Sequence, residues 1–458
     1  MSVSASSEVN QTGGAEVDPD VTVTPPKERR RVLISSFIGA LIEWYDFYLY
    51  GIASAIVFSR LFFPDFDNTV GTLLAFSTLA VGFFARPLGG AIWGHFGDKI
   101  GRKKMLVLSI IAMGICTTAM GLLPTYEQIG ILAPVLLVFL RLIQGLAGGG
   151  EWGGAVLMAM EHSPSKRGFS SSFPQMGLTG GILLASGVFA LMTLLPEEDL
   201  LTWGWRVPFL LSAVLVVIGM WIRLGVSESP VFVAAQKKAA AAAAAAELSG
   251  ETIAKPRAPL FEVFRHPKML IITILLVIGP FAASAIYLTF ATAYGIQVGF
   301  TAPQMLTATM IAAALGFLGQ PVFAIWSDSI GRKKVVGWGL ALQSLSGFLL
   351  FDQMNQGSLV GLYLAMCFAA AAHAMCYAPL AAWLGELFPT HLRYTGSSMG
   401  YQIAGSIGGG LTPAFCIALL LLAGGAPNSI LVAVFMCAIS LLSLVGVRMA
   451  KETYKSKL

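Results

Sequence analysis

The stretch GHFGDKIGRKKML at residues 94–106 occurs twice in this chain in closely related form. The second copy, WSDSIGRKKVV, covers residues 326–336, so that Asp98 and Asp328 lie 230 positions apart. Both copies are rich in charged residues, yet each lies between long apolar segments. A chain that repeats the same charged connection at such a distance is typical of an internally duplicated membrane protein.

A second pair of segments supports the duplication. EHSPSKRG at 161–168 matches ELFPTHLRYTG at 386–396, and the leading glutamates, Glu161 and Glu386, are 225 positions apart. A proline follows each glutamate three residues later, and an arginine follows six or seven residues later. The two offsets agree closely, so the two halves of the chain correspond over most of their length.

The composition excludes a soluble globular protein. Of the 458 residues, 56% are hydrophobic and only 12% are charged, about half the charged fraction of soluble domains. The net charge of +5 does not require a nucleic-acid partner if the basic residues lie on one side of a membrane. The five cysteines lie in apolar runs without metal-ligand spacing, so we expect no metal, no cofactor and no disulfide framework.

Twelve segments reach the length of about 20 apolar residues that a bilayer requires. We therefore expect an all-α membrane protein of twelve transmembrane helices in two six-helix halves. The expected spans lie near 32–58, 70–93, 105–123, 132–160, 169–195, 205–225, 269–296, 303–326, 335–352, 358–385, 396–423 and 428–449. Glycine runs at 145–154 and 405–410 are expected to let neighbouring helices approach closely.

The lysines and arginines predict the orientation. Of these 29 residues, 25 fall in the tails, the central loop, the loops after spans 2, 4, 8 and 10, or the span ends that adjoin them, which places those segments in the cytoplasm. We expect a multi-pass monomer in the cytoplasmic membrane, surrounded by lipid, with both termini inside. Its expected divisions are a disordered tail (1–31), a six-helix bundle (32–225), a cytoplasmic loop (226–268), a second bundle (269–450) and a tail (451–458).

Five motifs in this order resemble the metabolite:proton symporter family of the major facilitator superfamily. They are IEWYDFYLYG (42–51), FFARPLGG (83–90), GHFGDKIGRKK (94–104), RLIQGLAGGGEWGGA (141–155) and WGWRVPF (203–209). That family includes shikimate, α-ketoglutarate, dicarboxylate and proline/betaine carriers. The resemblance is strong over residues 32–230 and weaker beyond. It implies alternating access, with a substrate site between the halves near the middle of the membrane.

The resemblance also implies that the repeated loops form a cytoplasmic latch, closed when the carrier faces outward. The residues to which we assign this gating role are Arg86, Gly97, Asp98, Gly101, Arg102, Asp328 and Arg332. A carboxylate there can accept hydrogen bonds at a helix N-terminus, and the glycines permit a tight turn. The alternative is that the basic residues only fix the topology.

Charged side chains inside spans are costly in hydrocarbon and commonly mark function. The charged residues that lie well inside the spans, away from their ends, are Glu43, Asp46, Arg86, Arg141 and Glu151, all in the first half. By depth we expect two ion pairs, Asp46–Arg141 and Arg86–Glu151. These pairs either hold the spans together or carry function. We assign proton coupling to Asp46, Glu43 and Glu151, with Arg141 as the counter-charge of Asp46.

Arg141 and a set of neutral residues are candidates for substrate binding. The arginine is a candidate because a guanidinium binds a carboxylate through two parallel hydrogen bonds. Each neutral residue could instead be a packing residue. The candidates are Arg141, Gln144, Tyr45, Gln175, Tyr287, Tyr294, His373 and Gln402.

The sequence thus predicts a proton-coupled symporter that imports a small organic acid or zwitterion of the shikimate, dicarboxylate or betaine class. A carrier of the same fold that works uncoupled or by exchange remains an alternative, as does a membrane sensor that does not transport. An enzyme is excluded by the absence of a nucleophile–base pair, a nucleotide motif or a metal cluster in the sequence.

Overall fold

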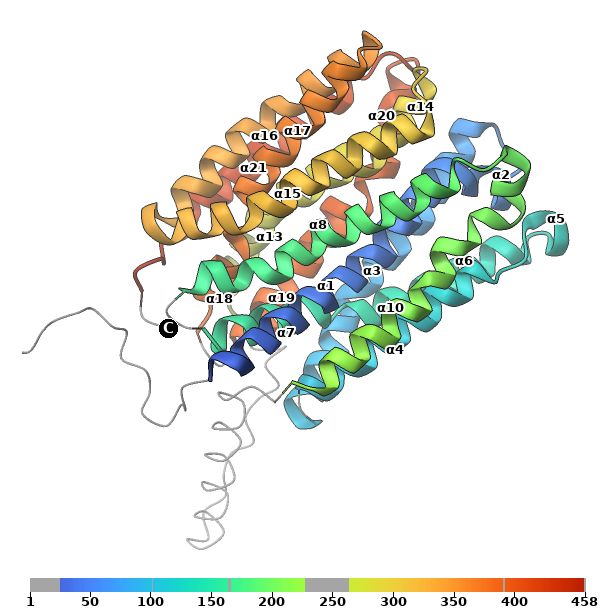
Figure 1. Ribbon diagram of the computed structural model, residues 1–458. Helices are drawn as coiled ribbons and strands as arrows, with labels where there is room; N and C mark the ends of the chain where they lie inside the picture. Colours follow the sequence, from blue (N-terminus) through green and yellow to red (C-terminus); the bar gives the residue numbers. More distant parts are fainter. Residues whose placement is uncertain (1–24, 101, 164–165, 227–262, 390–391, 457–458) are drawn as a thin grey trace, which may run out of the picture.

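The computed structural model describes residues 25–456 except 101, 164–165, 227–262 and 390–391, and it leaves the side chains of 94–95, 97–100 and 102 undescribed. In this part of the chain, twelve helical segments are long and apolar enough to cross a membrane (Figure 1). The twelve predicted spans are confirmed, because each coincides with one of these segments to within a few residues at most of their ends.

The first six spans contain several interrupted helices. Their elements are α1 (Pro26–Ala53), η1 (Ser54–Phe58), α2 (Ser59–Phe62), α3 (Asn68–Ile100), α4 (Arg102–Gly121), α5 (Tyr126–Ile129), α6 (Leu132–Gly148), α7 (Glu151–Glu161), α8 (Arg167–Met192), α9 (Glu197–Asp199), η3 (Leu200–Gly204) and α10 (Arg206–Leu224). The η elements are π-helical turns, which are common at functional positions within α-helices.

The last six spans follow the same plan. Their elements are α13 (Pro267–Ser284), η4 (Ala285–Phe290), α14 (Ala291–Gln297), α15 (Ala302–Ile330), α16 (Arg332–Asn355), α17 (Leu359–Tyr377), α18 (Leu380–Leu387), α19 (Arg393–Ala404), η5 (Gly405–Gly410), α20 (Thr412–Leu422) and α21 (Ile430–Met449). The fourth span of each half is broken: α6 and α7 are separated at a run of glycines, and α17 and α18 at Ala378–Pro379.

The halves meet along two seams. In Figure 1, α8 of the first half runs beside α15 of the second half, and these two helices pack closely. The other seam joins α3 to α19, η5 and α20. α1 begins and the chain ends at the same end of the bundle (Figure 1). We call this the termini end, and the other end the opposite end.

Glycine permits the closest helix contacts, as the sequence predicts. A Cβ atom on Gly145 would lie 2.0 Å from the carbonyl oxygen of Gly82, and one on Gly149 would lie 2.2 Å from that of Arg86. These two contacts bring the backbones of α3 and α6 together. At the second seam, a Cβ on Gly410 would lie 2.5 Å from Cβ of Phe83, so η5 approaches α3 just as closely.

Candidate functional site

Four charged side chains meet in the middle of the first half. Glu43 and Asp46 lie one helical turn apart on α1, while Arg86 lies on α3 and Arg141 on α6. All four are fully buried. Since a buried charge is costly unless it is paired or hydrogen-bonded, the partners of each group indicate what that group can do.

Glu43 pairs with Arg86. The Oε1 atom of Glu43 lies 3.0 Å from Nη2 of Arg86. The guanidinium carbon of Arg86 also lies 3.7 Å from the ring centre of Phe47, 5.1 Å from that of Trp44 and 5.0 Å from that of Phe83, so aromatic faces surround the cation. The predicted Arg86–Glu151 pair is wrong, because Arg86 pairs with Glu43 of α1 and Glu151 pairs with another arginine.

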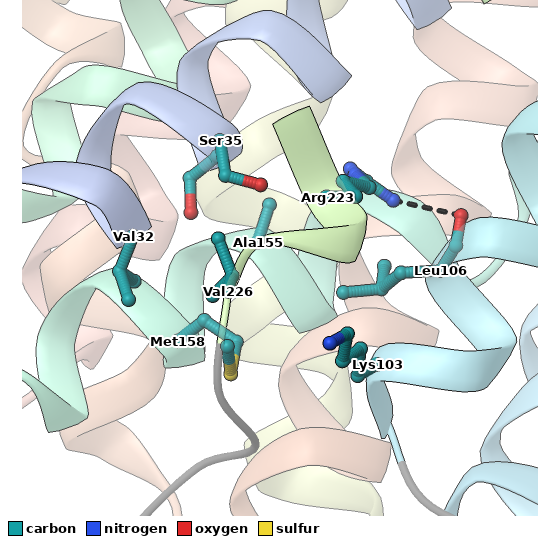
Figure 2. Close-up of a pocket in the computed structure, with 9 residues that line it drawn as sticks. Val32, Ser35, Lys103, Leu106, Ala155, Met158, Arg223 and Val226 are labelled. Carbon is teal, nitrogen blue, oxygen red and sulfur yellow. Dashed lines mark hydrogen bonds between the residues drawn. The ribbon is translucent and has the colours of Figure 1, made fainter. Parts of the chain in front are cut away.

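Glu151, at the start of α7, instead pairs with Arg223 near the end of α10. Nη1 of Arg223 donates to Oε2 of Glu151 at 2.9 Å, and Nη2 donates to Oε1. Nη1 also donates to the Leu106 carbonyl at 2.8 Å, and Figure 2 shows this contact beside a small pocket that Lys103 and Met158 help to line. Sequence reasoning missed Arg223 because it lies within three residues of its helix end, where it reads as a topology residue.

The predicted Asp46–Arg141 pair is wrong: among the described side chains these two residues form no ion pair. The Ser212 hydroxyl donates to Oδ1 of Asp46 at 2.7 Å, and Oδ2 has no hydrogen-bond partner in the described structure. Arg141 donates to Gln144, whose Nε2 donates to the Thr117 hydroxyl at 2.6 Å. Thr117 lies beside Asp46, and its hydroxyl donates to the Met113 carbonyl at 3.1 Å, so the acid and the arginine share polar neighbours without a continuous chain of hydrogen bonds.

Arg141 also lies against aromatic rings. Its guanidinium carbon is 4.0 Å from the ring centre of Tyr50 and 4.5 Å from that of Phe47. Phe47 therefore separates the two buried arginines, with Arg86 on it at 3.7 Å. The predicted neighbourhood of Asp46, Arg141 and Gln144 is present, although the contact that joins the acid and the arginine is indirect.

Neutral polar groups face this region from the second half. The hydroxyls of Tyr377 and Tyr401 are hydrogen-bonded to each other, and the ring of His373 stacks on Tyr377 with centres 5.0 Å apart. Tyr287 lies against the same histidine at 5.8 Å. Neither ring nitrogen of His373 has a hydrogen-bond partner in the described structure, although the side chain is only 2% exposed.

A small pocket lies between the halves at this level. From the first half α1 and α3 line it, and from the second half α13, η4 and η5 do. The lining residues are Trp44, Phe47, Tyr48, Leu79, Phe83, Phe281, Ser284, Ala285, Thr289 and Gly409. Because both halves contribute, a relative movement of the halves would change the shape of this pocket.

Two glutamines connect the halves through the broken spans. Nε2 of Gln402 donates to the Gly149 carbonyl at 2.8 Å, where α6 stops before α7. Nε2 of Gln175 donates to the Tyr377 carbonyl at 3.0 Å, where α17 stops before α18. A helix end leaves carbonyls without intrahelical partners, so each break offers an acceptor to the other half. Both glutamines were predicted as substrate residues; in this structure they bridge the halves.

A proline supplies a further contact of this type. Pro87 has no N–H, so the carbonyl of Phe83, four residues earlier, has no intrahelical donor. The hydroxyl of Ser406 in η5 donates to that carbonyl at 2.6 Å. The motif that contains Arg86 therefore also fixes the seam between α3 and η5.

Two predicted substrate residues are bound within their own halves. The Tyr45 hydroxyl donates to the Pro208 carbonyl at 2.6 Å and so ties α1 to α10. The Tyr294 hydroxyl donates to Asn355 and, at 3.0 Å, to the Pro427 carbonyl. Neither side chain lines the pocket between the halves, and the geometry gives both residues a packing role.

The second copy of the repeated loop joins the halves at the termini end. Asp328 accepts hydrogen bonds from the backbone N–H groups of Gly168 at 3.2 Å and Phe169 at 3.3 Å, at the N-terminus of α8. There the charge of the aspartate meets the positive end of the helix dipole. Arg332 lies 2.6 Å from Asp328 and 3.2 Å from Glu386.

Glu386 extends this contact into the first half, because it also lies 3.2 Å from Arg167. We call Arg167, Asp328, Arg332 and Glu386 the termini-end latch. The last residues of the chain support it: Glu452 accepts the backbone N–H groups of Arg332 and Lys333, each at 3.0 Å. The predicted tail at 451–458 thus includes a segment packed on the second loop copy.

Most side chains of the first copy of the loop are not described, although its backbone is described except at residue 101. The side chains of Gly97, Asp98 and Arg102 are not described, and Gly101 lies outside the described chain. The backbone places residues 97–100 at the end of α3 and residue 102 at the start of α4. Their predicted gating role stays a prediction.

These features together define a carrier: twelve spans in two repeated halves, a pocket between the halves, and buried charges beside that pocket. The chain belongs to the major facilitator superfamily, and a family model described as "Sugar (and other) transporter" matches residues 32–456. It is therefore a multi-pass membrane transporter of small molecules, and the predicted resemblance is confirmed.

The chain is similar to several known proteins. It is 39% identical over 443 residues to the shikimate transporter of Escherichia coli (strain K12), covering 96% of this chain and 98% of that protein. It is 32% identical over 443 residues to the proline/betaine transporter of the same organism, covering 95% of this chain and 86% of that protein. The xylose transporter of E. coli, in a partially occluded inward-open conformation, shares the fold with a TM-score of 0.74 and 19% identity, over 94% of this chain and 100% of that chain.

Proposed function

We propose that this protein is a proton-coupled symporter that imports a small organic acid or zwitterion, of the shikimate, dicarboxylate or betaine class, across the cytoplasmic membrane. The termini end would face the cytoplasm, because it carries most of the basic loop residues. The observation that carries the proposal is the buried pair of acids on α1, Glu43 and Asp46, each of which lies near a buried arginine. Apolar residues in the same places would stabilise the fold at least as well as these charged groups. Stability alone therefore does not explain why the charged groups are present.

Asp46 is the best candidate for the coupled proton. It has no ion-pair partner among the described side chains, and one of its oxygens has no hydrogen-bond partner there. Thr117 and Gln144 are polar neighbours of both Asp46 and Arg141. The proton affinity of Asp46 depends on the distance to that arginine, so a movement of α6 relative to α1 could load the proton on one side and release it on the other.

The other two acids are less suited to coupling. Glu43 is held by Arg86, so it can take a proton only when that pair opens. Glu151 uses both oxygens on Arg223, and this arrangement favours a structural role. Coupling also requires that proton and substrate each favour the binding of the other. The termini-end latch would close the inner side while the outer side loads.

The test uses purified protein in liposomes with and without an imposed inward proton gradient. We expect the gradient to drive substrate accumulation by the unmodified protein. Asp46→Asn, which mimics the protonated acid, should still exchange substrate between loaded sides but should lose accumulation driven by the gradient. Accumulation by Asp46→Asn at the normal level would exclude Asp46 as the coupling site. If the gradient has no effect on the unmodified protein, the carrier works by exchange or without coupling.

A further inference from the structure

A deep apolar groove lies on the outside of the second half. Residues of α13, η5, α20 and α21 form it, and its volume is about 380 Å³, compared with about 20 Å³ for the pocket between the halves. Thr412 is the only lining residue with a polar side chain. The lining residues are Ile278, Ala282, Ile407, Gly408, Leu411, Thr412, Ala414, Phe415, Phe435 and Ile439.

The groove opens toward the lipid. Three of its large apolar side chains, Ile407, Leu411 and Phe415, are 42%, 40% and 47% exposed. They follow one another at intervals of four residues and therefore share one face of their span. All the lining residues belong to the second half, so the mouth of the groove is on the outer surface of the bundle and not at a seam with the first half.

The depth of the groove in the membrane restricts what can occupy it. Its residues lie well inside the spans Pro267–Gln297, Arg393–Leu422 and Ile430–Met449. The charged residues of these three spans are Lys268 and the two arginines at positions 393 and 448, all near span ends. A charged protein segment or a lipid headgroup would be costly at this depth. The hydrocarbon of an acyl chain carries no such cost, and it is the material that surrounds the spans there.

The segments that line the groove also line the pocket between the halves, from their other side. In η5, Ile407 and Gly408 line the groove while the next residue, Gly409, lines the pocket. In α13, Ala282 lines the groove while its neighbour Phe281 lines the pocket. A wall one segment thick thus separates the lipid from the pocket. Within that wall η5 has the sequence GSIGGG and is π-helical, so it lacks both side-chain bulk and regular helix hydrogen bonding.

η5 also holds the second seam closed. The Ser406 hydroxyl donates to the Phe83 carbonyl of α3 at 2.6 Å, and a Cβ on Gly410 would lie 2.5 Å from Cβ of Phe83. Ile407 and Leu411 lie on the other face of the segment, in the groove. If the seam opens by separation of η5 from α3, η5 must therefore move toward the groove.

We propose that the acyl chain of a membrane phospholipid occupies this groove and stabilises the closed second seam, because it fills the space into which η5 would move. A chain in the groove supplies dispersion contacts to η5 and α20, and at the packing density of protein interiors it leaves η5 little room to shift. The site requires only the carrier fold and is independent of the proton coupling proposed above.

Photocrosslinking of the full-length protein, purified in detergent, tests the occupant. The photoreactive amino acid benzoylphenylalanine replaces Leu411 at the rim of the groove or, as a control, Leu318. Leu318 is 66% exposed in the middle of its span and does not line the groove. Detergent displaces loosely held lipid from both surfaces. We expect intact-protein mass spectrometry to show an adduct of one phospholipid at 411, at least about tenfold more abundant than at 318, for a preference of about 1.4 kcal/mol.

A variant that fills the groove tests the function of the chain. Ala414→Phe places a ring in the groove and should reduce the phospholipid adduct at 411 by at least about tenfold. Ala314→Phe, at a half-buried alanine of α15, is the matched control and should leave the adduct unchanged. Spin labels at the exposed positions 104 and 334, one on each half, report closure. Removal of lipid should shift the unmodified protein and the control about threefold toward the open form, through the loss of several dispersion contacts. Ala414→Phe should not shift, because its ring replaces the chain.

Several results would overturn the proposal. A covalent dimer at 411 would show that a second copy covers the groove, and a crosslink within the chain would show that one of its own segments does. Equal phospholipid adducts at 411 and 318, or adducts of detergent alone, would show that the groove does not select lipid. A phospholipid adduct together with label distances that do not respond to lipid removal would overturn the stabilising role. Should Ala414→Phe not fold, Ala414→Leu places a smaller side chain in the groove, and the same direction is expected.

Discussion

Glu151 and Arg223 illustrate how tightly one buried ion pair can be built into a helix bundle. Gly39 of α1 lies against both side chains: a Cβ atom there would be 2.7 Å from Oε1 of Glu151 and closer still to Arg223. Only glycine permits that approach. The pair thus joins three spans, because Glu151 lies on α7, Arg223 on α10 and Gly39 on α1, and Leu106 of α4 adds a carbonyl.

Removing one partner of this pair should destabilise the protein strongly. Glu151→Gln and Arg223→Gln each leave an unpaired buried charge, at a cost of about 3–5 kcal/mol. The double variant leaves no charge and should recover a large part of that loss. Thermal unfolding of the protein in detergent measures all three. If the double variant loses as much stability as the two single variants added together, the two residues do not interact.

At the residue scale, the sequence predicts which side chains matter better than which side chains meet. The five charges that we assigned to span interiors, Glu43, Asp46, Arg86, Arg141 and Glu151, are all buried in the structure. Helical periodicity and depth, however, do not say which neighbouring helix a face contacts, and two of the pairings that we predicted are absent for that reason. Arg223 is missed because proximity to a helix end hides it among the topology residues. That both ring nitrogens of His373 lack partners in the described structure depends on three-dimensional packing alone.

At the scale of elements, the ends and breaks of helices carry the contacts between halves. The sequence predicts the spans because apolar length is a local property. It does not predict that α6 and α17 stop inside their spans, or that the stopped helices offer carbonyls to Gln402 and Gln175. The packing of Glu452 on the start of α16 is equally invisible to hydropathy, since the segment is short and polar.

The latch residue Asp328 should act on the equilibrium between open and closed forms. Asp328→Asn loses the charge at the N-terminus of α8 and the ion pair with Arg332, for a loss of about 1–2 kcal/mol and a shift of roughly 5- to 30-fold toward opening of the termini end. Spin labels at the exposed positions 104 and 334 would report longer distances between the halves. An unchanged distance distribution would leave the loop as a topology device.

The first loop copy offers a parallel variant. Asp98→Asn should leave the protein folded and inserted and should shift it toward the form open at the cytoplasmic side, with a loss of about 1–3 kcal/mol from one charge-assisted contact. Transport should fall while accessibility of the cavity from that side rises. Comparison with Asp328→Asn, using the same pair of labels, shows whether both copies latch. Normal transport with unchanged accessibility would confine the first copy to a topological role.

At the scale of the whole molecule, the orientation in the membrane is the first property to test. Positions 65 and 197 are exposed; residue 65 follows α2, which Figure 1 shows at the opposite end, and Glu197 pairs with Arg60 of α2. Cysteines at these positions should react with an impermeant thiol reagent added outside cells. A cysteine at 245, in the central segment outside the described residues, should react only after the cells are opened, because its loop is expected in the cytoplasm. External labelling of 245 would reverse the assignment of inside and outside for the latch.

The duplication should also be visible in the energetics of closure. Gln175 and Gln402 occupy corresponding positions in the two halves, as do the carbonyls of Tyr377 and Gly149 that they bind, so the two hydrogen bonds are related by the same repeat as the loops. Each links a stopped helix to the other half, in a different seam.

Gln175→Ala and Gln402→Ala should each reduce the free energy that favours the closed form by about 1 kcal/mol. The double variant should reduce it by the sum, because separate sites act additively. Gln356→Ala, which removes an exposed glutamine at the opposite end, should cost nothing. Distances between labels at 104 and 334 measure the populations. If only one glutamine affects closure, only one of the two seams stabilises the closed form. The symmetry of the sequence repeat then does not extend to the conformational change.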